Sequence, residues 1–263
     1  MNIAITPLIL TYNEAPNIQR TLGALSWARE IIIIDSGSTD GTLELAKAAH
    51  PNVKIIDRPF DNHPNQWNFG LDQIKTEWVL SLDADYVLTP ELTSEIVGLD
   101  PPADVAGYSA EFRYCIFGHF LRSSVYPARV VLFRRARARY VTDGHTQLVK
   151  TDGMVRQLKS PIYHDDRKPL SRWLQDQDRY SKIEAQNLLS RPLGELNFQD
   201  RLRRRIFFAP AAMFFYLLFG RGLILDGWPG WYYVAQRTIA EFLLSIRLLI
   251  EREKLEFRDG VNG

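Results

Sequence analysis

The first hundred residues alternate between short apolar runs and segments with helical spacing. Apolar runs typical of buried strands occupy residues 3–10, 31–34, 53–56 and 78–82. Ile18, Leu22 and Leu25 recur at helical spacing after the first run, and a further helix is expected around residues 67–74. This alternation predicts an α/β fold, with a mostly parallel sheet and helices on both faces. Pro7 lacks a backbone donor, so we expect the first strand to be irregular or at a sheet edge.

Polar clusters follow three of these predicted strands. They are Thr-Tyr-Asn-Glu at residues 11–14, a loop of small and capping residues at 35–42, and the triplet Asp-Ala-Asp at 83–85. In open parallel sheets, ligands bind beyond the carboxyl ends of the strands. The three clusters therefore predict a binding site at one edge of the sheet.

The two carboxylates of the triplet favour a metal site. Strand side chains alternate in direction, so Asp83 and Asp85 are expected on the same side, where they repel unless they share a cation. Mg²⁺ or Mn²⁺ binds one or two carboxylates and leaves its other positions to water and phosphates. We therefore expect a diphosphate held through a metal, although so short a motif also occurs in solvated turns.

Composition excludes some classes of partner. The 32 basic and 31 acidic residues nearly cancel, so no global field would attract nucleic acid. The single cysteine, Cys115, fits a reducing compartment, and the chain has no basic leader before its first apolar residues. We expect no nucleic-acid partner and no signal peptide.

The last third has a different character. Residues 206–220 carry no charge and follow an arginine cluster made up of Arg201, Arg203, Arg204 and Arg205. A bilayer span needs roughly 20 apolar residues, and Pro210 and Arg221 interrupt this run, so an interfacial helix suits it better. Residues 228–233 and a helix over 240–250 would extend the same surface. An ordinary helical core or a dimer interface is the alternative, and a helix over 173–189, capped by Ser171, is expected before this region.

The three polar clusters, in this order and spacing, resemble the signatures of family 2 glycosyltransferases, and most closely those that add sugars to lipopolysaccharide cores. The resemblance is good to about residue 100 and moderate to about 190. It implies a GT-A fold, a nucleotide-diphosphate sugar donor such as a UDP-hexose, a divalent Mg²⁺ or Mn²⁺, and inversion at the anomeric carbon. It also implies a catalytic domain over residues 1–190, with a donor half (1–105) and an acceptor half (106–190), and then a membrane-associating helical region (191–263).

Site residues are carried over by position in the same resemblance. Thr11, Asn13 and Glu14 would border the nucleoside, Asp35 the base or ribose, Asp83 the ribose and metal, and Asp85 the metal directly; His164 would be a third metal ligand, Arg167 or Lys168 would reach the diphosphate, and Arg129 would contact donor or acceptor. Helix capping is the alternative for Asp35 and for Asp40. A solvated charged loop is the alternative for residues 164–168.

The catalytic base is where the chain departs from the resemblance. Family members often carry Val-His-Glu where this chain has Gly144, His145 and Thr146. Asp143 is therefore the first candidate for the base and His145 the second, while a turn at Asp143 and Gly144 is the competing interpretation.

The sequence thus predicts an inverting, metal-dependent glycosyltransferase, peripheral on the cytoplasmic face of the inner membrane, with a lipid-linked or lipopolysaccharide-type acceptor. Two alternatives stay open. One is a phosphatase of the haloacid-dehalogenase type with Asp83 as nucleophile, although that motif should follow the first strand. The other is a membrane-associated protein that binds a nucleotide sugar without catalysis.

Overall fold

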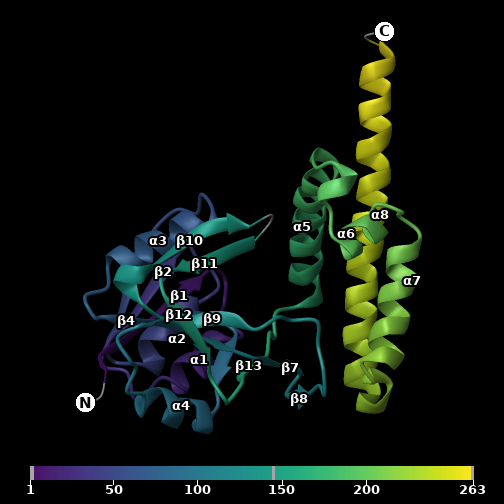
Figure 1. Ribbon diagram of the computed structural model, residues 1–263. Coiled ribbons are helices and arrows are strands. Elements are labelled where there is room, and N and C mark those ends of the chain that lie inside the picture. The colour runs from purple at the N-terminus through teal and green to yellow at the C-terminus, as the bar shows by residue number, and fades with distance from the viewer. Residues whose placement is uncertain (1–2, 144–145, 262–263) are drawn as a thin grey trace. The chain divides into compact units, whose positions relative to one another are not determined.

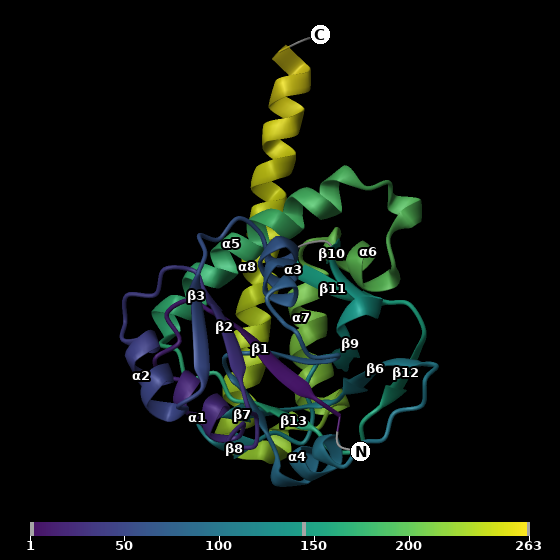
Figure 2. The same cartoon turned by 90° about the vertical axis from the view of Figure 1, so that its left-hand side faces the viewer.

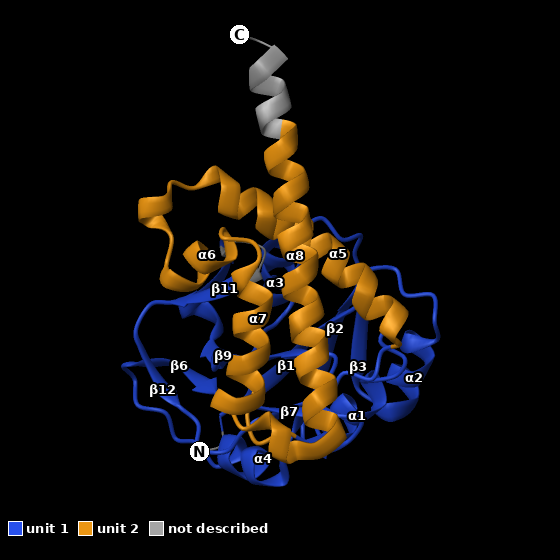
Figure 3. Ribbon diagram, turned by 90° about the vertical axis from the view of Figure 1, so that its right-hand side faces the viewer, with its two compact units in different colours: residues 1–120, 125–168 blue, residues 121–124, 169–263 orange. Residues whose placement is uncertain are grey.

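The computed structural model describes residues 3–143 and 146–261 (Figure 1). Its contacts form two compact units, coloured separately in Figure 3. Unit 1 comprises residues 1–120 and 125–168, and unit 2 comprises residues 121–124 and 169–263. The functional division at residue 190 stays a prediction.

Unit 1 begins with alternating strands and helices. In order they are β1 (Ile5–Thr11), α1 (Ile18–Gly23), β2 (Ile31–Asp35), α2 (Thr42–Ala49), β3 (Val53–Asp57), α3 (His63–Asp72), β4 (Trp78–Asp83), β5 (Tyr86–Leu88) and α4 (Pro90–Val97). Strands then dominate: β6 (Val105–Ala110), β7 (Phe112–Ile116), β8 (His119–Phe120), β9 (Arg129–Arg134), β10 (Ala138–Asp143), β11 (Thr146–Thr151), β12 (Met154–Gln157) and β13 (Ile162–His164). All four strands predicted from the first hundred residues are present.

The main sheet has the strand order β12-β6-β9-β4-β1-β2-β3 (Figure 2). β1 is parallel to both β2 and β4, and β2 is parallel to β3. β9 alone among these seven strands runs antiparallel, against both β4 and β6. The predicted α/β class with a mostly parallel sheet is confirmed.

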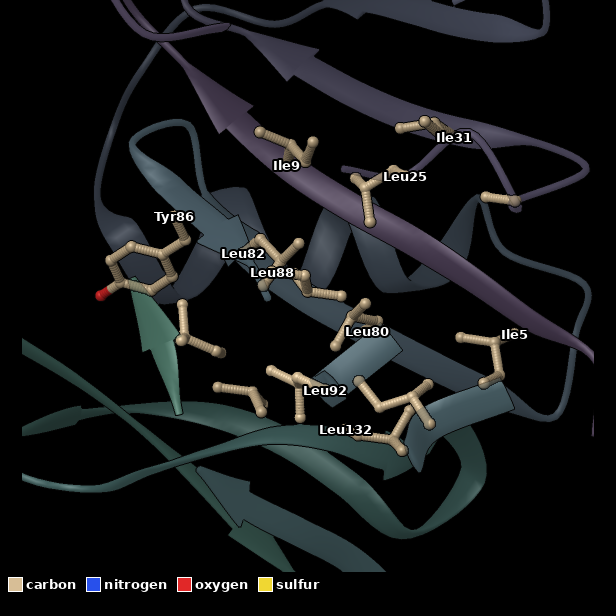
Figure 4. Close-up of a cluster of buried hydrophobic side chains, with 14 of the residues drawn as sticks. Ile5, Ile9, Leu25, Ile31, Leu80, Leu82, Tyr86, Leu88, Leu92 and Leu132 are labelled. Carbon is tan, nitrogen blue, oxygen red and sulfur yellow. The ribbon is translucent and has the colours of Figure 1, made fainter. Parts of the chain in front are cut away.

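Both faces of the sheet are apolar, so the sheet has to be covered on both sides. Side chains alternate along β1, where Ile5 and Ile9 face one core while Leu8 faces the other. Helices α1, α2 and α4 cover the first core and α3 the second (Figure 1). Figure 4 shows the first core, in which Leu80 and Leu132 from neighbouring strands lie with Leu92 of α4.

The position expected for Pro7 is wrong, because β1 lies inside the sheet between β4 and β2. Pairing with β4 starts at Ile5, whereas pairing with β2 starts only at Leu8. Pro7 therefore lies where β1 has a partner on one side alone. A missing backbone donor is tolerated there, since one side of the strand has no ladder to break.

A four-stranded sheet, β5-β13-β7-β8, closes the same unit. β13 runs antiparallel to β5, so His164 at the end of β13 lies opposite Tyr86 at the start of β5. Asp85 immediately precedes Tyr86 in the chain. This pairing brings together two residues that are 79 positions apart.

The β10–β11 hairpin is attached to α3 by a side chain that acts as a strand partner. The Asn68 amide donates to the Tyr140 carbonyl and accepts from the Tyr140 backbone N–H, both at 3.0 Å. The Tyr140 ring stacks on Trp67 at 5.0 Å, and its hydroxyl donates to Ser81 of β4 at 2.6 Å. The hairpin is thereby fixed to the strand that ends at Asp83.

Unit 2 is helical. It contains α5 (Leu170–Ser190), α6 (Phe198–Arg203), α7 (Phe208–Phe215), a π-helical turn η3 (Tyr216–Gly220), a 3-10 turn η4 (Leu223–Asp226) and α8 (Gly227–Val261). A core that includes Leu188, Leu196 and Leu248 joins α5 to α8. α5 starts at Leu170 after Pro169, so Ser171 lies inside the helix and is not its cap, contrary to the prediction.

Three of the four arginines of the cluster form hydrogen bonds within unit 2. Arg203 makes a two-oxygen hydrogen-bonded pair with the buried carboxylate of Glu241, Arg201 donates to the Leu196 carbonyl, and Arg204 donates to the Arg191 carbonyl. These bonds tie the segment around α6 to α5 and α8. A buried Glu241 is stable only with such a partner.

Residues 121–124 belong to unit 2, although the rest of that unit starts at residue 169. The Arg122 backbone N–H and side-chain Nε donate to the two carboxylate oxygens of Asp226, at 3.0 and 2.7 Å. Arg221 in turn donates to the Ser124 carbonyl at 2.6 Å. This four-residue segment is thus part of the helical unit, although both flanks belong to unit 1.

In the part of the chain that the structure describes, no single helix is long and apolar enough to cross a membrane. Residues 208–220 and 223–254 meet the length and composition criteria only as a pair, with a 68° bend between them.

Asn68→Ala should lower the free energy of unfolding by about 2 kcal/mol, because two backbone groups of Tyr140 lose their partners. Urea unfolding followed by circular dichroism measures the change. Gln73→Ala is the matched control, since that α3-capping side chain makes one long contact of 3.5 Å. Equal stability of the Asn68→Ala protein and the wild type would show that α3 does not hold the hairpin.

Candidate active site

The carboxyl ends of β1, β2 and β4 meet at one edge of the sheet, as predicted. Thr11 at the end of β1 pairs in register with Asp35 at the end of β2, and Leu10 pairs with Asp83 at the end of β4. The three polar clusters are therefore neighbours in space. Some of their side chains are bonded within the protein, and others are available to bind a ligand.

Asp35 organises the first two loops. It is almost fully buried, and its carboxylate accepts from the Thr11 hydroxyl at 2.7 Å and from the backbone N–H groups of Gly37 and Ser38 at 2.9 and 2.8 Å. The Ser38 hydroxyl donates to it as well, at 2.6 Å. Both oxygens are thus engaged by the protein, and a direct contact of Asp35 with a donor stays a prediction.

Asn13 is held in a strained backbone conformation by this loop. Its φ of 56° lies in the left-handed region, which asparagine tolerates better than most residues. The Asn13 side chain accepts from the Thr39 N–H at 2.8 Å, and its own N–H donates to the Ser38 hydroxyl at 2.8 Å. Asp40 similarly accepts from the N–H groups of Ala15 and Thr42, the first residue of α2. The N-cap position itself is Gly41, so Asp40 stabilises the start of the helix from one residue before the cap.

Asp85 and His164 form a buried pair. The His164 Nε2 atom lies 3.2 Å from the Asp85 Oδ2 atom, and both side chains are nearly inaccessible to solvent. Although burial opposes ionisation, the charge and hydrogen bond of His164 and the charge of Lys168 lower the pKa of Asp85 to about 2. The Asp85 carboxylate in turn raises the pKa of His164 against the effect of burial.

A second buried pair lies beside the first. The Lys168 Nζ atom is 2.8 Å from the Glu14 Oε1 atom. Burial raises the pKa of Glu14 to about 7, a shift that Lys168 opposes and Asp85 reinforces. Burial disfavours the Lys168 ammonium, but Glu14 and Asp85 raise its pKa above the ordinary value. Two cations and two carboxyl groups therefore share one poorly solvated site.

Asn17 connects this site to the loop after β13, and sequence reasoning missed it. The fully buried Asn17 amide donates to Glu14 and Asp166 at 2.9 and 3.0 Å, and its oxygen accepts from the Arg167 N–H at 3.0 Å. Arg20, also missed, pairs with Asp165. Of these residues only Arg20 lies within α1, and Asn17 is the residue before its first turn, so no helical spacing in the sequence marked them as a group.

Arg167 and Lys168 differ in their contacts. Arg167 donates through Nε and Nη2 to Asp165 at 3.0 and 2.8 Å and is largely exposed, whereas Lys168 points to Glu14 and is largely buried. The segment from residue 164 to 168 is thus a packed set of ion pairs and not a solvated loop. Diphosphate binding by either cation stays a prediction.

Asp83 and Asp85 are separated by a turn. β4 ends at Asp83 and β5 starts at Tyr86, so the strand alternation that predicted a common side does not extend to Asp85. Asp83 is half-buried, and its carboxylate makes no hydrogen bond with another residue that the structure describes. Arg129 begins β9, which is antiparallel to β4, and therefore lies toward the same edge.

The structure describes the position of only one of the two candidate bases in the chain. Asp143 is the last residue of β10 and pairs in register with Thr146, the first residue of β11. His145, like Gly144, lies outside the described residues. Both assignments stay predictions.

The fit of a divalent metal can be judged from the atoms present. The Asp85 Oδ1 and His164 Nδ1 atoms are buried and have no hydrogen-bond partner, which is costly unless another group compensates. A carboxylate and an imidazole are suitable ligands for such an ion. Within residues 3–143 and 146–261, however, no three acidic, histidine or cysteine side chains gather as one group. The Asp85 Oδ1 atom therefore fits a metal ligand, whereas the His164 Nδ1 atom lies on the side of the imidazole away from Asp85. Ligation by His164, which would have to be neutral, and by Asp83 stays a prediction.

Comparison with known proteins places the chain in a family. Residues 8–156, more than half of the chain, match the family described as Glycosyl transferase family 2. The lipopolysaccharide core biosynthesis glycosyltransferase LpsC of Rhizobium meliloti is 24% identical over 268 residues, covering 99% of this chain and 97% of that protein. An uncharacterized glycosyltransferase of Rickettsia bellii is 36% identical over 93 residues, which is 35% of this chain and 31% of that protein.

Solved structures with similar folds include S. aureus TarS 1-349 in complex with UDP-GlcNAc, which is 15% identical, with a TM-score of 0.43 over 96% of this chain and 92% of that one. Glucosyl-3-phosphoglycerate synthase from Mycobacterium tuberculosis, in complex with Mn²⁺, UDP and glucosyl-3-phosphoglycerate, is 14% identical, with a TM-score of 0.45 over 71% of this chain and 79% of that one. From the extent of the family match, this protein belongs to glycosyl transferase family 2 and is a glycosyltransferase.

Proposed function

We propose that this glycosyltransferase moves a hexose from a nucleotide diphosphate, UDP in the first instance, to a glycan acceptor with inversion at the anomeric carbon. The observation that carries the proposal is the ionised, buried Asp85 beside two cationic side chains, with one carboxylate oxygen unpartnered. Such a group at the carboxyl edge of a parallel sheet suits a phosphate-bearing ligand bound through a cation. Family membership leaves the phosphatase alternative without support.

Charge is the chemical problem in this reaction. Negative charge grows on the diphosphate as the glycosidic bond breaks, and a fixed positive group stabilises it. Lys168 would supply such a charge from within the protein, because Glu14 and Asp85 keep its ammonium protonated despite burial. A divalent ion held by Asp85 and His164 would add positive charge at the same diphosphate when bound.

The acceptor hydroxyl must lose a proton on the opposite side of the sugar ring. Asp143 is the proposed base, because it ends β10 and because Thr146 stands where relatives often carry glutamate. Asn68 and Tyr140 would serve the reaction by holding this hairpin to α3 and β4. His145 is the second candidate.

The proposed acceptor is a lipopolysaccharide-type or lipid-linked glycan. LpsC, which resembles this chain along nearly its whole length, is named for lipopolysaccharide core biosynthesis. An acceptor of this kind is anchored in a membrane, so the enzyme would work as a peripheral protein on the inner face of the cytoplasmic membrane.

The solvent-facing side of α8 supports the membrane part of this proposal. From residue 228 to 250 its most exposed large side chains are uncharged, and most of them lie three, four or eight residues from the next: Trp228, Trp231, Ile239, Phe242, Ile246, Leu249 and Ile250. An exposed helix side that is apolar along its length is typical of a surface that faces lipid or another protein. We call these seven residues the α8 stripe.

The neighbouring helix carries a similar surface. Phe208, Phe215 and Phe219, on α7 and η3, are each more than half exposed, and α7 packs against α8. Arg205, which precedes α7, is exposed and has no ion pair with another described residue. Aromatic rings with a nearby arginine suit a bilayer that contains anionic phospholipid. The bent pair of residues 208–220 and 223–254 would lie in the interface without crossing it.

Asp85→Asn should lower the rate of UDP release from UDP-hexoses at least 100-fold, because the amide removes the charge that holds both His164 and a metal. A panel of UDP-hexoses assayed with Mn²⁺, and again with excess chelator, measures this. Asp104→Asn changes an exposed carboxylate before β6 and is the control. Wild-type turnover by Asp85→Asn, or full activity in chelator, would contradict the proposed role of Asp85.

Glu14→Gln should change how stability depends on pH. The pKa of Glu14 is raised from 4.5 to about 7 on folding, so its favourable contribution is complete below pH 4.5 and is lost as pH rises to about 7. Relative to Glu14→Gln, the wild type should lose about 3 kcal/mol of unfolding free energy over this range, at 1.36 kcal/mol per unit. Urea titrations at several pH values measure the difference. Glu91→Gln, an exposed change in α4, is the control, and a difference that does not vary with pH would disprove the assignment.

Phe242→Glu combined with Ile246→Glu should weaken binding to vesicles that contain anionic phospholipid at least tenfold, because both carboxylates lie in the α8 stripe. Vesicle sedimentation measures binding. Phe60→Glu, a change at an exposed aromatic residue of unit 1, should bind as the wild type does. If the wild type is instead a dimer that the double variant dissociates, and neither binds vesicles, the stripe is a protein interface and the membrane proposal fails.

A further inference from the structure

Arg129 is a half-buried cation that forms no ion pair with a carboxylate among the described side chains. Its guanidinium lies over the ring of Tyr126, with 4.9 Å between the guanidinium carbon and the ring centroid. Among the side chains and carbonyl groups that the structure describes, none accepts a hydrogen bond from this side chain. A guanidinium carries five N–H donors and stays charged, so this one has unused binding capacity.

The groups around Arg129 keep it charged in a poorly solvated place. Burial opposes the cation, while Tyr126, Tyr86 and Asp83 raise the pKa of Arg129. Asp83 is close enough to act through its charge and yet makes no ion pair with Arg129 within the 4.0 Å that defines one. Asp83 thus balances Arg129 from a distance and leaves its fork of N–H groups available.

Arg129 also stands next to the candidate active site. The Tyr126 ring contacts the His164 ring edge-on, with centroids 4.8 Å apart, and Tyr86 contacts the same imidazole at 5.2 Å. The hydroxyls of Tyr86 and Tyr126 are hydrogen-bonded to each other. A wall of rings therefore runs from the Asp85–His164 pair to the guanidinium.

The chemistry of such a group is specific. A planar guanidinium binds carboxylate and phosphate through two parallel N–H···O bonds, and an aromatic face below it restricts its plane. Lysine in the same place would offer a point charge without the fork.

We propose that Arg129 binds an oxyanion group, a phosphate or a carboxylate, of one of the two substrates, with Tyr126 holding the guanidinium in place. The inference rests on the proposed function, since it assigns a ligand class to one side of the same site. Two sources share this chemistry: the diphosphate of the donor, and an acidic sugar or phosphorylated sugar in the acceptor.

Binding measurements on Arg129→Met and Arg129→Lys test the proposal and separate the two sources. Inorganic pyrophosphate and UDP report on the donor, while hexose 6-phosphate and hexuronate, each compared with the neutral hexose, report on the acceptor. Isothermal titration calorimetry of the full-length chain gives each dissociation constant. Arg113→Met is the matched control, because Arg113 also lies over an aromatic ring, that of Phe120 at 4.7 Å, but is exposed in β7.

Arg129→Met should weaken one class of anion at least tenfold and leave the other class and the neutral hexose unchanged. A loss for pyrophosphate and UDP assigns the donor, and a loss for hexose 6-phosphate or hexuronate assigns the acceptor. If the Met variant does not fold, Arg129→Lys decides, since it keeps the charge that balances Asp83 and loses only the fork. Unchanged affinity for all four anions, or equal losses in Arg113→Met, would overturn the proposal.

The failure of this inference can be told from the failure of the proposed function. A wild type that releases UDP in an Asp85-dependent manner, with Arg129 variants that bind all anions normally, keeps the function and removes the subsite. A wild type that binds no UDP and none of the other anions removes both.

Discussion

The site depends on keeping a carboxylate ionised where water is scarce. Asp85 is buried and still holds a pKa of about 2, because the charges of His164 and Lys168 outweigh the cost of desolvation. Each of these cations comes from the segment that follows β12, about 80 residues later in the chain. The pairing of β13 with β5 is what brings them to Asp85, so the small sheet is as important for the site as the large one.

Much of unit 1 was predictable from the sequence because its signals are local. Apolar runs of four to eight residues gave β1 to β4, and polar clusters at their ends gave the edge at which Thr11, Asp35 and Asp83 meet. The prediction from Pro7 was wrong because a rule about proline in strands does not show where the pairing with each neighbouring strand begins. Asn17 and Arg20 were missed because their partners, Asp165 and Asp166, lie almost 150 positions away and sequence pattern does not reveal such pairs.

Less of unit 2 could be predicted from the sequence. The apolar character of residues 206–220 was visible, but a cluster of arginines beside it suggested lipid head groups. In the structure Arg203 pairs with the buried Glu241, and Arg201 and Arg204 donate to backbone carbonyls. Most of these cations therefore bond within the unit. Charge counted along a sequence does not distinguish a cation that faces solvent from one that holds helices together. The exposed side of α8, where apolar residues recur without a charge, is the more specific signal.

The place of residues 121–124 in unit 2 has a consequence for how the chain folds during synthesis. Arg122 leaves the ribosome before its partner Asp226, which is 104 residues further along the chain. Domains generally fold as units from the N-terminus as they emerge. Unit 1 must therefore carry an unfinished loop, two residues before Tyr126, until the chain has been translated at least to Asp226.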